Sequence, residues 1–321
     1  MHHNTKKFAT LLLSCLLILS MFLCSVGFAE EESKGLIVIM TPAHSNPFFK
    51  VISDSATQRA EELGYEVLSL QHDDDVVKQN EIFETAIARG AVGIVCDNAG
   101  AEATVEPART ALEAGIPTVM VGREINQTGV ALAQLVSNNY QGAQLLAEYF
   151  IETVGEEGGY VEILGKESDT NAHIRTSGFH DIIDQYPNIT MVAQQTGNWN
   201  QTEAYEKMES IIQSNAGEFV AVYAPGDPMA LGCYEALKKA GITDVLVFGF
   251  DGNNDARDSI LRGEVAATIL QPISEMSMLA VDIIDDYVQN GTKPEVEKQL
   301  FDCILITAEN ADKLDNFVYT E

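Results

Sequence analysis

Short apolar runs rich in β-branched residues alternate with longer amphipathic stretches along most of this 321-residue chain. Runs such as 36–41 and 118–121 have the length of strands, and stretches such as 48–63 and 75–89 repeat apolar residues at helical spacing. Strands that alternate with helices usually pair in parallel, because each helix returns the chain to the starting edge of the sheet. We therefore expect an α/β fold with parallel sheets covered by helices on both faces.

The expected elements fall into two similar series. The strands of the first series are 36–41, 66–70, 92–96, 118–121 and 131–136, and those of the second are 160–164, 189–195, 219–223, 245–250 and 266–270, with a late strand at 303–306. The expected helices are 48–63, 75–89, 101–114, 141–154, 171–185, 201–215, 229–240, 255–262 and 274–290. Two series of about five strands each predict two Rossmann-like lobes rather than one long sheet.

The N-terminus has the pattern of an export signal. Lys6 and Lys7 precede an apolar stretch that reaches about residue 26, and Ala29 completes a small-x-small cleavage site. This pattern predicts a signal peptide of residues 1–29 and hence a periplasmic or extracellular protein. An uncleaved membrane anchor is the alternative reading, since the apolar run approaches spanning length. Lipoprotein processing is disfavoured, because Cys24 follows a large residue and Cys15 lies too early.

The charge of the chain excludes one class of partner. It carries 48 Asp and Glu against 19 Lys and Arg, a formal net charge of −29. Phosphate backbones repel so acidic a surface, so we expect no nucleic-acid binding. Anionic membrane surfaces are disfavoured for the same reason.

The sequence offers no motif for catalysis, metal binding or a cofactor. GxSxG, Walker A, HExxH and a GxGxxG after a strand are all missing. Beyond the signal, Cys96, Cys233 and Cys303 form an odd, widely spaced set that predicts neither a disulfide framework nor a metal site, and whether any two are bridged stays open. The acidic run that ends at Asp75 is interpreted as the N-cap of a helix. We expect a protein that is not an enzyme.

Residues directly after the expected strands supply the candidate site. In open parallel sheets, ligands bind at the carboxyl ends of the strands. These positions carry aromatic, arginine, carboxylate and amide side chains, which suit a polyol because rings cover its C–H faces and charged groups bind its hydroxyls. Each residue also has a simpler reading: Phe48, Phe49 and Trp199 as packing, and Arg123 and Arg175 as surface ion pairs.

Several of these segments together resemble periplasmic sugar-binding proteins of the ribose-binding type, the solute receptors of ABC importers. The resemblance covers about residues 35–308. It is carried by Ser45-Asn46-Pro47-Phe48-Phe49, Asp227-Pro228-Met229-Ala230-Leu231-Gly232, Val247-Phe248-Gly249-Phe250-Asp251-Gly252 and Ala266-Ala267-Thr268-Ile269-Leu270-Gln271.

The resemblance implies a type I periplasmic-binding-protein fold with three hinge crossings. Its N-terminal lobe would comprise residues 35–137 and 272–302, and its C-terminal lobe residues 138–271 and 303–321. It further implies a monomer without a cofactor, which captures a small sugar or sugar alcohol by hinge closure and delivers it to a permease. The implied ligand-binding residues are Asn46, Phe48, Phe49, Asp97, Arg123, Asn171, Arg175, Trp199, Asp227, Phe250, Asp251 and Gln271.

Three departures from the ribose-binding pattern bear on the ligand. Gly122 stands where that pattern has Asp, and Asp97 and Gly226 stand where it has Asn. These changes put ribose itself in doubt and favour a ribose-like pentose or a short polyol. A receptor for a furanosyl quorum signal, or one for chemotaxis, is the alternative function. Because strand-end residues usually lie outside the core, truncating Arg123, Arg175 or Asp251 is expected to weaken binding and to change folding little.

Overall fold

The computed structural model describes residues 33–320, and the chain from Gly35 onward forms one compact unit. The expected signal peptide, residues 1–29, and its two cysteines, Cys15 and Cys24, lie outside the described residues. Within the described range, no helix is both long and apolar enough to cross a membrane.

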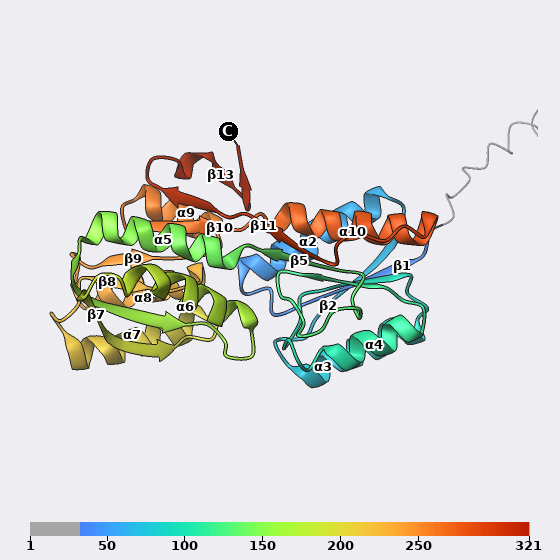
Figure 1. The fold of residues 1–321 in the computed structure, drawn as a ribbon, viewed down its shortest axis with the longest axis horizontal. Coiled ribbons are helices and arrows are strands. Elements are labelled where there is room, and N and C mark those ends of the chain that lie inside the picture. The colour runs from blue at the N-terminus through green and yellow to red at the C-terminus, as the bar shows by residue number, and fades with distance from the viewer. Residues whose placement is uncertain (1–32, 321) are drawn as a thin grey trace, which may run out of the picture. The chain divides into compact units, whose positions relative to one another are not determined.

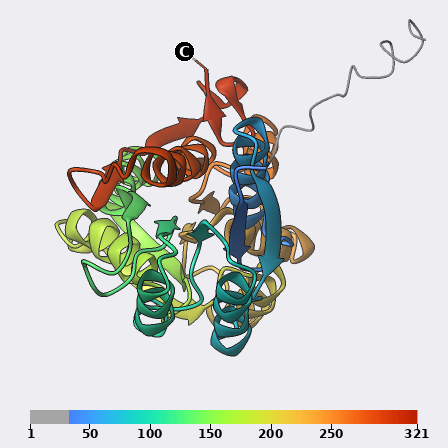
Figure 2. The same ribbon diagram turned by 90° about the vertical axis from the view of Figure 1, so that its right-hand side faces the viewer.

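The first sheet has six strands in the order β11-β5-β4-β3-β1-β2, all parallel to their neighbours. Two helices pack together on each of its faces: α2 with α10 on one, and α3 with α4 on the other (Figure 2). The elements of this N-terminal lobe are β1 (Leu36–Thr41), α2 (Pro47–Glu62), β2 (Glu66–Gln71), α3 (Val76–Ala88), β3 (Gly93–Cys96), α4 (Val105–Glu113), β4 (Thr118–Val121), β5 (Ala133–Ser137), α10 (Ile273–Asn290) and β11 (Lys298–Phe301).

The second sheet has the order β12-β10-β9-β8-β6-β7, and only its edge strand β12 is antiparallel to its neighbour. Helices α5 and α6 pack together on one face and α7 and α8 on the other (Figure 1). The elements of this C-terminal lobe are α5 (Asn139–Val154), β6 (Glu157–Leu164), α6 (Thr170–Ile183), β7 (Asn188–Thr196), α7 (Gln201–Asn215), β8 (Ala221–Tyr223), α8 (Asp227–Lys239), β9 (Leu246–Phe248), α9 (Asn254–Leu261), β10 (Ala267–Leu270) and β12 (Ile304–Thr307).

Strand β1 shows why its apolar run is continuous rather than alternating. Ile37 and Ile39 pack into the cluster that holds α2 and α10, whereas Val38 and Met40 pack into the cluster under α3 and α4. All four side chains are fully buried. A strand covered on both faces needs apolar residues at every position, which is the pattern that predicts the parallel sheet.

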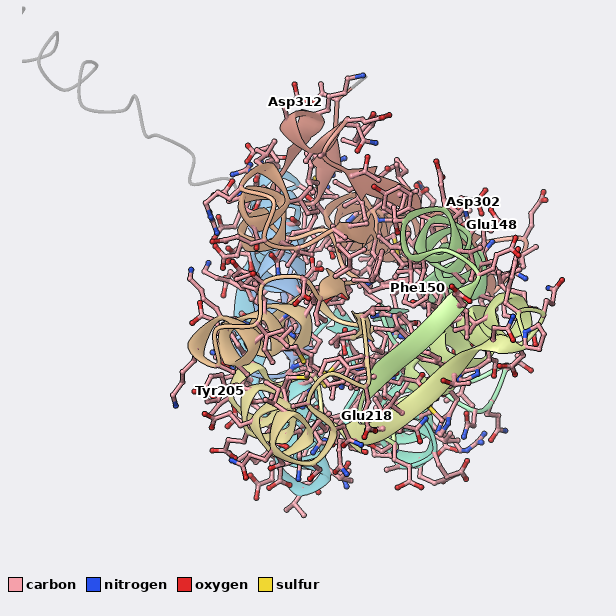
Figure 3. All side chains as sticks on the ribbon, turned by 90° about the vertical axis from the view of Figure 1, so that its left-hand side faces the viewer. Glu148, Phe150, Tyr205, Glu218, Asp302 and Asp312 are labelled. Carbon is pink, nitrogen blue, oxygen red and sulfur yellow. The ribbon has the colours of Figure 1, made fainter. Side chains whose placement is uncertain are left out.

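Aromatic side chains fill the core of the C-terminal lobe beneath α5 and α6. Phe150 of α5, labelled in Figure 3, is fully buried and lies 4.9 Å from Phe248 of β9, measured between ring centroids. Phe179 of α6 stacks on Tyr223 of β8 with ring centroids 3.8 Å apart. This packing fixes α6 against the sheet and so holds the helix that carries Arg175.

The structure adds elements that the sequence pattern does not predict. Strand β11 was missed because it lies at a sheet edge, where Lys298 and Leu300 are exposed and no buried apolar run marks it. A short hairpin of β13 (Leu314–Asp315) and β14 (Val318–Tyr319) follows a 3-10 turn (Ala311–Lys313) near the C-terminus. Helix α4 begins at residue 105 rather than at the expected 101.

The chain passes between the two sheets three times. It leaves the first sheet after β5, returns to it after β10, and leaves again between β11 and β12. These passages bring the loops of both lobes to one region, where the candidate site lies.

Candidate ligand-binding site

One cavity lies where loops that follow strands of both sheets meet. The side chains around it combine aromatic rings, two arginines, carboxylates and amides. Its lining residues are Asn46, Phe48, Phe49, Arg123, Asp169, Asn171, Arg175, Trp199, Gly226, Pro228 and Asp251.

The loop after β1 places two aromatic rings at the cavity. Asn46 is the N-cap of α2, and its Oδ1 accepts a hydrogen bond from the backbone N–H of Phe48 at 3.0 Å. Pro47 follows at the first helical position, where its fixed φ favours the turn. Phe48 and Phe49 therefore occupy the first turn, are buried, and meet edge to face with ring centroids 5.7 Å apart.

Arg123, which follows β4, lies among three carboxylates. Its Nη1 donates to Asp74 Oδ1 at 2.6 Å, and its Nε lies 2.8 Å from Asp169 Oδ2 and 3.3 Å from Asp97 Oδ1. Burial alone would lower the pKa of Arg123, but the carboxylates raise it further than burial lowers it. The guanidinium is also 5.0 Å from the centroid of the Phe49 ring. Its Nη2 is buried without a hydrogen-bond partner among residues 33–320.

Asp97, at the end of β3, lies behind this arginine rather than in the cavity lining. The side chain is fully buried, and burial raises the pKa of its carboxyl well above the usual range, although Arg123 partly opposes the shift. A Cβ on Gly122 would lie only 2.6 Å from Asp97 Oδ2. Gly122 therefore leaves room for the carboxylate of Asp97.

Arg175 of α6 is the corresponding cation of the C-terminal lobe. Its Nε donates to Asn139 Oδ1 at 2.7 Å, and its Nη1 donates to the Pro225 carbonyl at 2.7 Å and to Asp251 Oδ1 at 3.1 Å. The guanidinium lies 3.9 Å from the centroid of the Phe250 ring, which is fully buried beneath it. These contacts hold the planar group in one orientation at the cavity wall.

Asp251 is held by residues that stand behind the lining. It has φ 124°, outside the range most side chains adopt, and Gln271 Nε2 donates to its Oδ1 at 2.8 Å. Asp227 Oδ2 accepts the backbone N–H groups of Gly252 and Asn253, both at 2.8 Å. Asp227 thus fixes the turn that presents Asp251. Burial raises the pKa of both carboxyls.

Trp199 closes the cavity from the loop between β7 and α7. Its side chain is 9% exposed, and its Nε1 is buried with no hydrogen-bond partner in the described part of the chain. Arg175 lies 5.3 Å from the centroid of its ring. With Phe49 on the other lobe, Trp199 also borders a wider hollow of about 400 Å³, so the two rings lie between the cavity and that hollow.

Direct contacts join the two lobes around the cavity. Arg123 pairs with Asp169, and Asn171 Nδ2 donates to the carbonyl of Gly122 at 2.9 Å. Farther out, Lys166 Nζ donates to the carbonyl of Asp74 at 3.1 Å. The lobes are therefore in direct contact beside the cavity.

The cavity brings together eight of the twelve residues expected from the sequence. The other four, Asp97, Asp227, Phe250 and Gln271, are fully buried behind the lining and contact or support Arg123, Arg175 and Asp251. Sequence reasoning did not assign Asp74, Asp169, Gly226 or Pro228 to the site. Asp169 had a detectable signal, because Asp is a favoured N-cap residue and its Oδ1 accepts the N–H of Asn171 at the start of α6.

Among residues 33–320, no group of three or more His, Cys, Asp and Glu side chains has an arrangement that could hold a metal ion. Cys96, Cys233 and Cys303 are buried and unpaired. Asp75 caps α3 as expected, because its Oδ1 accepts the N–H of Val77 at 2.7 Å.

Comparison with known proteins identifies relatives over nearly the whole chain. The family model described as periplasmic binding protein domain matches residues 37–293. A D-apiose import binding protein of Actinobacillus succinogenes is 52% identical over 96% of this chain and 98% of its own length. A D-apiose import binding protein of Paraburkholderia graminis is 51% identical over 89% of this chain and 91% of its own length.

A solved structure shares the same architecture. The Caulobacter myo-inositol binding protein, bound to myo-inositol, superposes with a TM-score of 0.83 at 24% identity, covering 91% of this chain and 99% of the other. At this level of identity the likeness shows the fold, with two Rossmann-like lobes that each contain a predominantly parallel sheet.

Proposed function

The chain belongs to the periplasmic binding protein family, and we propose that it captures D-apiose or a closely similar small sugar in the cavity between its lobes for delivery to the permease of an ABC importer. The two relatives named for D-apiose import support this choice of sugar, since each is more than half identical to this chain. Apiose is a pentose, whose C–H faces suit the aromatic rings of the cavity lining and whose hydroxyls suit its charged and amide groups.

The observation that carries the proposal is a pair of buried donors at the cavity wall. Arg123 Nη2 and Trp199 Nε1 belong to lining residues, and neither has a hydrogen-bond partner within residues 33–320. A buried donor without a partner costs about 1–3 kcal/mol. Hydroxyl oxygens of a bound sugar would accept both hydrogen bonds, whereas an apolar ligand would leave both donors without a partner.

Ligand-driven hinge closure is the mechanism that we propose. Arg123 and Phe49 would grip the sugar from the N-terminal lobe, and Arg175, Trp199 and Asp251 from the C-terminal lobe. A ligand that contacts both lobes binds the closed form more tightly and shifts the population toward it. We propose lobe boundaries at residues 35–137 with 272–302 and at 138–271 with 303–321, so that the three passages between the sheets act as the hinge.

The remaining parts of the proposal concern cellular context. The N-terminal pattern of residues 1–29 supports export and cleavage near Ala29, and family membership supports a periplasmic location. We propose a monomer that binds its sugar without converting it, because the site lacks a nucleophile paired with a base.

A thermal-shift and calorimetry series tests the function. The chain beginning at residue 30 is titrated with D-apiose, D-ribose, L-arabinose, erythritol, myo-inositol and a furanosyl quorum signal. D-apiose is expected to raise Tm most, because a ligand at 100 times its Kd stabilises the folded state by about 2.7 kcal/mol. Tighter binding of the furanosyl signal would favour a signalling receptor, and no shift with any of these compounds would overturn the proposal.

A matched pair of variants localises the binding. Phe49→Ala removes a ring at the cavity, whereas Lys50→Ala removes the next side chain, which is exposed and pairs with Asp54 on the outside of α2. Only the first substitution is expected to weaken binding of D-apiose.

A further inference from the structure

Gly165 lies against the indole of Trp199, although 33 residues separate them in the sequence. Gly165 follows β6 directly, and a Cβ at this position would lie 2.0 Å from Cη2 and 2.1 Å from Cζ2 of Trp199. Gly226, at the N-cap of α8, approaches the same ring, and a Cβ there would lie 3.2 Å from Cε3. The six-membered ring of the indole therefore rests against two stretches of backbone that lack side chains.

Space, rather than backbone conformation, requires the glycine at position 165. Gly122 has φ +79° and so adopts a conformation that other residues avoid, whereas the φ of Gly165 lies outside that left-handed range. Alanine at 165 would meet no backbone strain, but its Cβ cannot share the volume of the indole. The indole would have to move.

The backbone of its loop helps to set the direction of the Trp199 side chain. Asn198 and Trp199 both have left-handed backbone conformations, with φ 51° and 61°, which aim the side chain from the loop. The ring lines the cavity and also rests against Gly165. A displacement away from Gly165 therefore changes the position of the indole at the cavity wall and also moves its unpartnered Nε1.

We propose that Gly165 is a specificity-determining residue, because its missing side chain lets Trp199 lie deep enough to leave room for a pentose ring in the cavity. This inference rests on the proposed function. The depth of the indole sets the width of the cavity and the position from which Nε1 donates to a sugar hydroxyl. Gly165 acts through Trp199 and does not itself line the cavity.

Trp199 is the only tryptophan in the chain, so its fluorescence reports the position of this ring directly. The experiment compares wild type, Gly165→Ala and the control Gly100→Ala, whose Cβ would make only ordinary contacts, at 3.8 Å or more. For each protein, emission and acrylamide quenching are recorded without ligand. Kd is then measured for D-apiose and for the smaller erythritol.

Gly165→Ala is expected to shift the emission and to weaken D-apiose binding by about tenfold or more, a typical effect of one carbon in a tight pocket. Binding of erythritol should weaken less than binding of D-apiose, so the ratio of the two Kd values changes in favour of the smaller ligand. Gly100→Ala should match wild type in every measurement. In a Trp199→Phe background, Gly165→Ala should reduce the affinity for D-apiose less than it does in wild type, because phenylalanine lacks the outer ring atoms of the indole that collide with the new Cβ.

The outcomes separate this inference from the proposed function. Unchanged emission and an unchanged Kd ratio in Gly165→Ala overturn the inference, even where wild type binds D-apiose. Failure of wild type to bind any sugar overturns the proposed function, and the inference with it, whatever the fluorescence shows. If Gly165→Ala melts far below wild type, the same substitution is compared in the Trp199→Phe background, where the loss in Tm and in D-apiose affinity should shrink because the colliding ring atoms are absent; an equal loss in both backgrounds overturns the inference.

Discussion

The Nε of Arg123 in the N-terminal lobe lies 2.8 Å from the Oδ2 of Asp169 in the C-terminal lobe. Both side chains are at most 6% exposed, and both line the cavity. The arginine that the sequence assigns to ligand binding is therefore also a direct tie between the lobes. In the proposed hinge closure, such contacts between the lobes would add to the contacts with the sugar.

Asp169→Asn tests this tie. The variant keeps an N-cap for α6, because asparagine caps as well as aspartate, but it removes the charge that faces Arg123. We expect an affinity loss of about 1–2 kcal/mol, or about five- to thirtyfold, with little change in Tm. Calorimetric titration measures this, with Asp54→Asn on the outer face of α2 as the control. Wild-type affinity in Asp169→Asn would show that the tie does not contribute to closure.

Arg123→Ala is expected to destabilise the fold as well as to abolish tight binding. This revises the expectation that strand-end residues affect binding alone, because Arg123 is buried and compensates Asp74, Asp97 and Asp169. Removing one partner of a buried ion pair typically costs about 3–5 kcal/mol. Urea unfolding without ligand measures the loss, and a midpoint equal to that of wild type would contradict the prediction.

Arg175→Lys tests the oriented guanidinium of the C-terminal lobe. Lysine keeps the charge, but it cannot donate to Asn139, the Pro225 carbonyl and Asp251 together while stacking on Phe250. We expect an affinity loss of about 2–4 kcal/mol, or about thirtyfold to nearly a thousandfold, measured by titration with D-apiose. A loss of affinity below threefold would mean that a positive charge at position 175 is enough for binding. Lys238→Arg, at an exposed pair on α8, serves as the matched control.

The stability of the C-terminal lobe is expected to depend on pH through His180. Its Nε2 lies 3.2 Å from the buried Glu162 and its Nδ1 lies 3.1 Å from Asp184. The hydrogen bond with Glu162 raises the pKa of His180 to about 9, although burial opposes the shift. A raised histidine pKa stabilises the fold fully below the unfolded value of about 6.5, and this contribution disappears as pH rises through about 9.

Melting curves between pH 6 and 9.5 measure this dependence. His180→Gln should melt below wild type at pH 6, and the difference should shrink toward pH 9.5. His173→Gln, which changes an exposed histidine on the same helix, should follow the wild-type curve. A pH-independent difference between wild type and His180→Gln would show that the contact is not ionic.

The spacing of apolar residues along a segment is a local property of the sequence. For this reason the sequence by itself determined the architecture. The fully apolar run of β1 indicates a strand covered on both faces, and its alternation with amphipathic helices leads to parallel sheets. The order of strands and helices also determined which residues reach the carboxyl edge of each sheet, which is how Phe49, Arg123 and Arg175 could be assigned to the site. β11 lacks such a pattern, since an edge strand needs no continuous apolar run.

Only the tertiary structure decided which strand-end side chains line the cavity and which support it. Asp227 and Asp251 both follow strands, yet Asp227 turns back to accept two backbone N–H groups while Asp251 lines the cavity. The sequence pattern of a strand indicates at which edge of the sheet the next residues lie. It does not indicate in which direction their side chains point in the loop that follows. The contacts of Arg123 with Asp169 and of Gly165 with Trp199 join segments distant in sequence, so they exist only once the chain has folded.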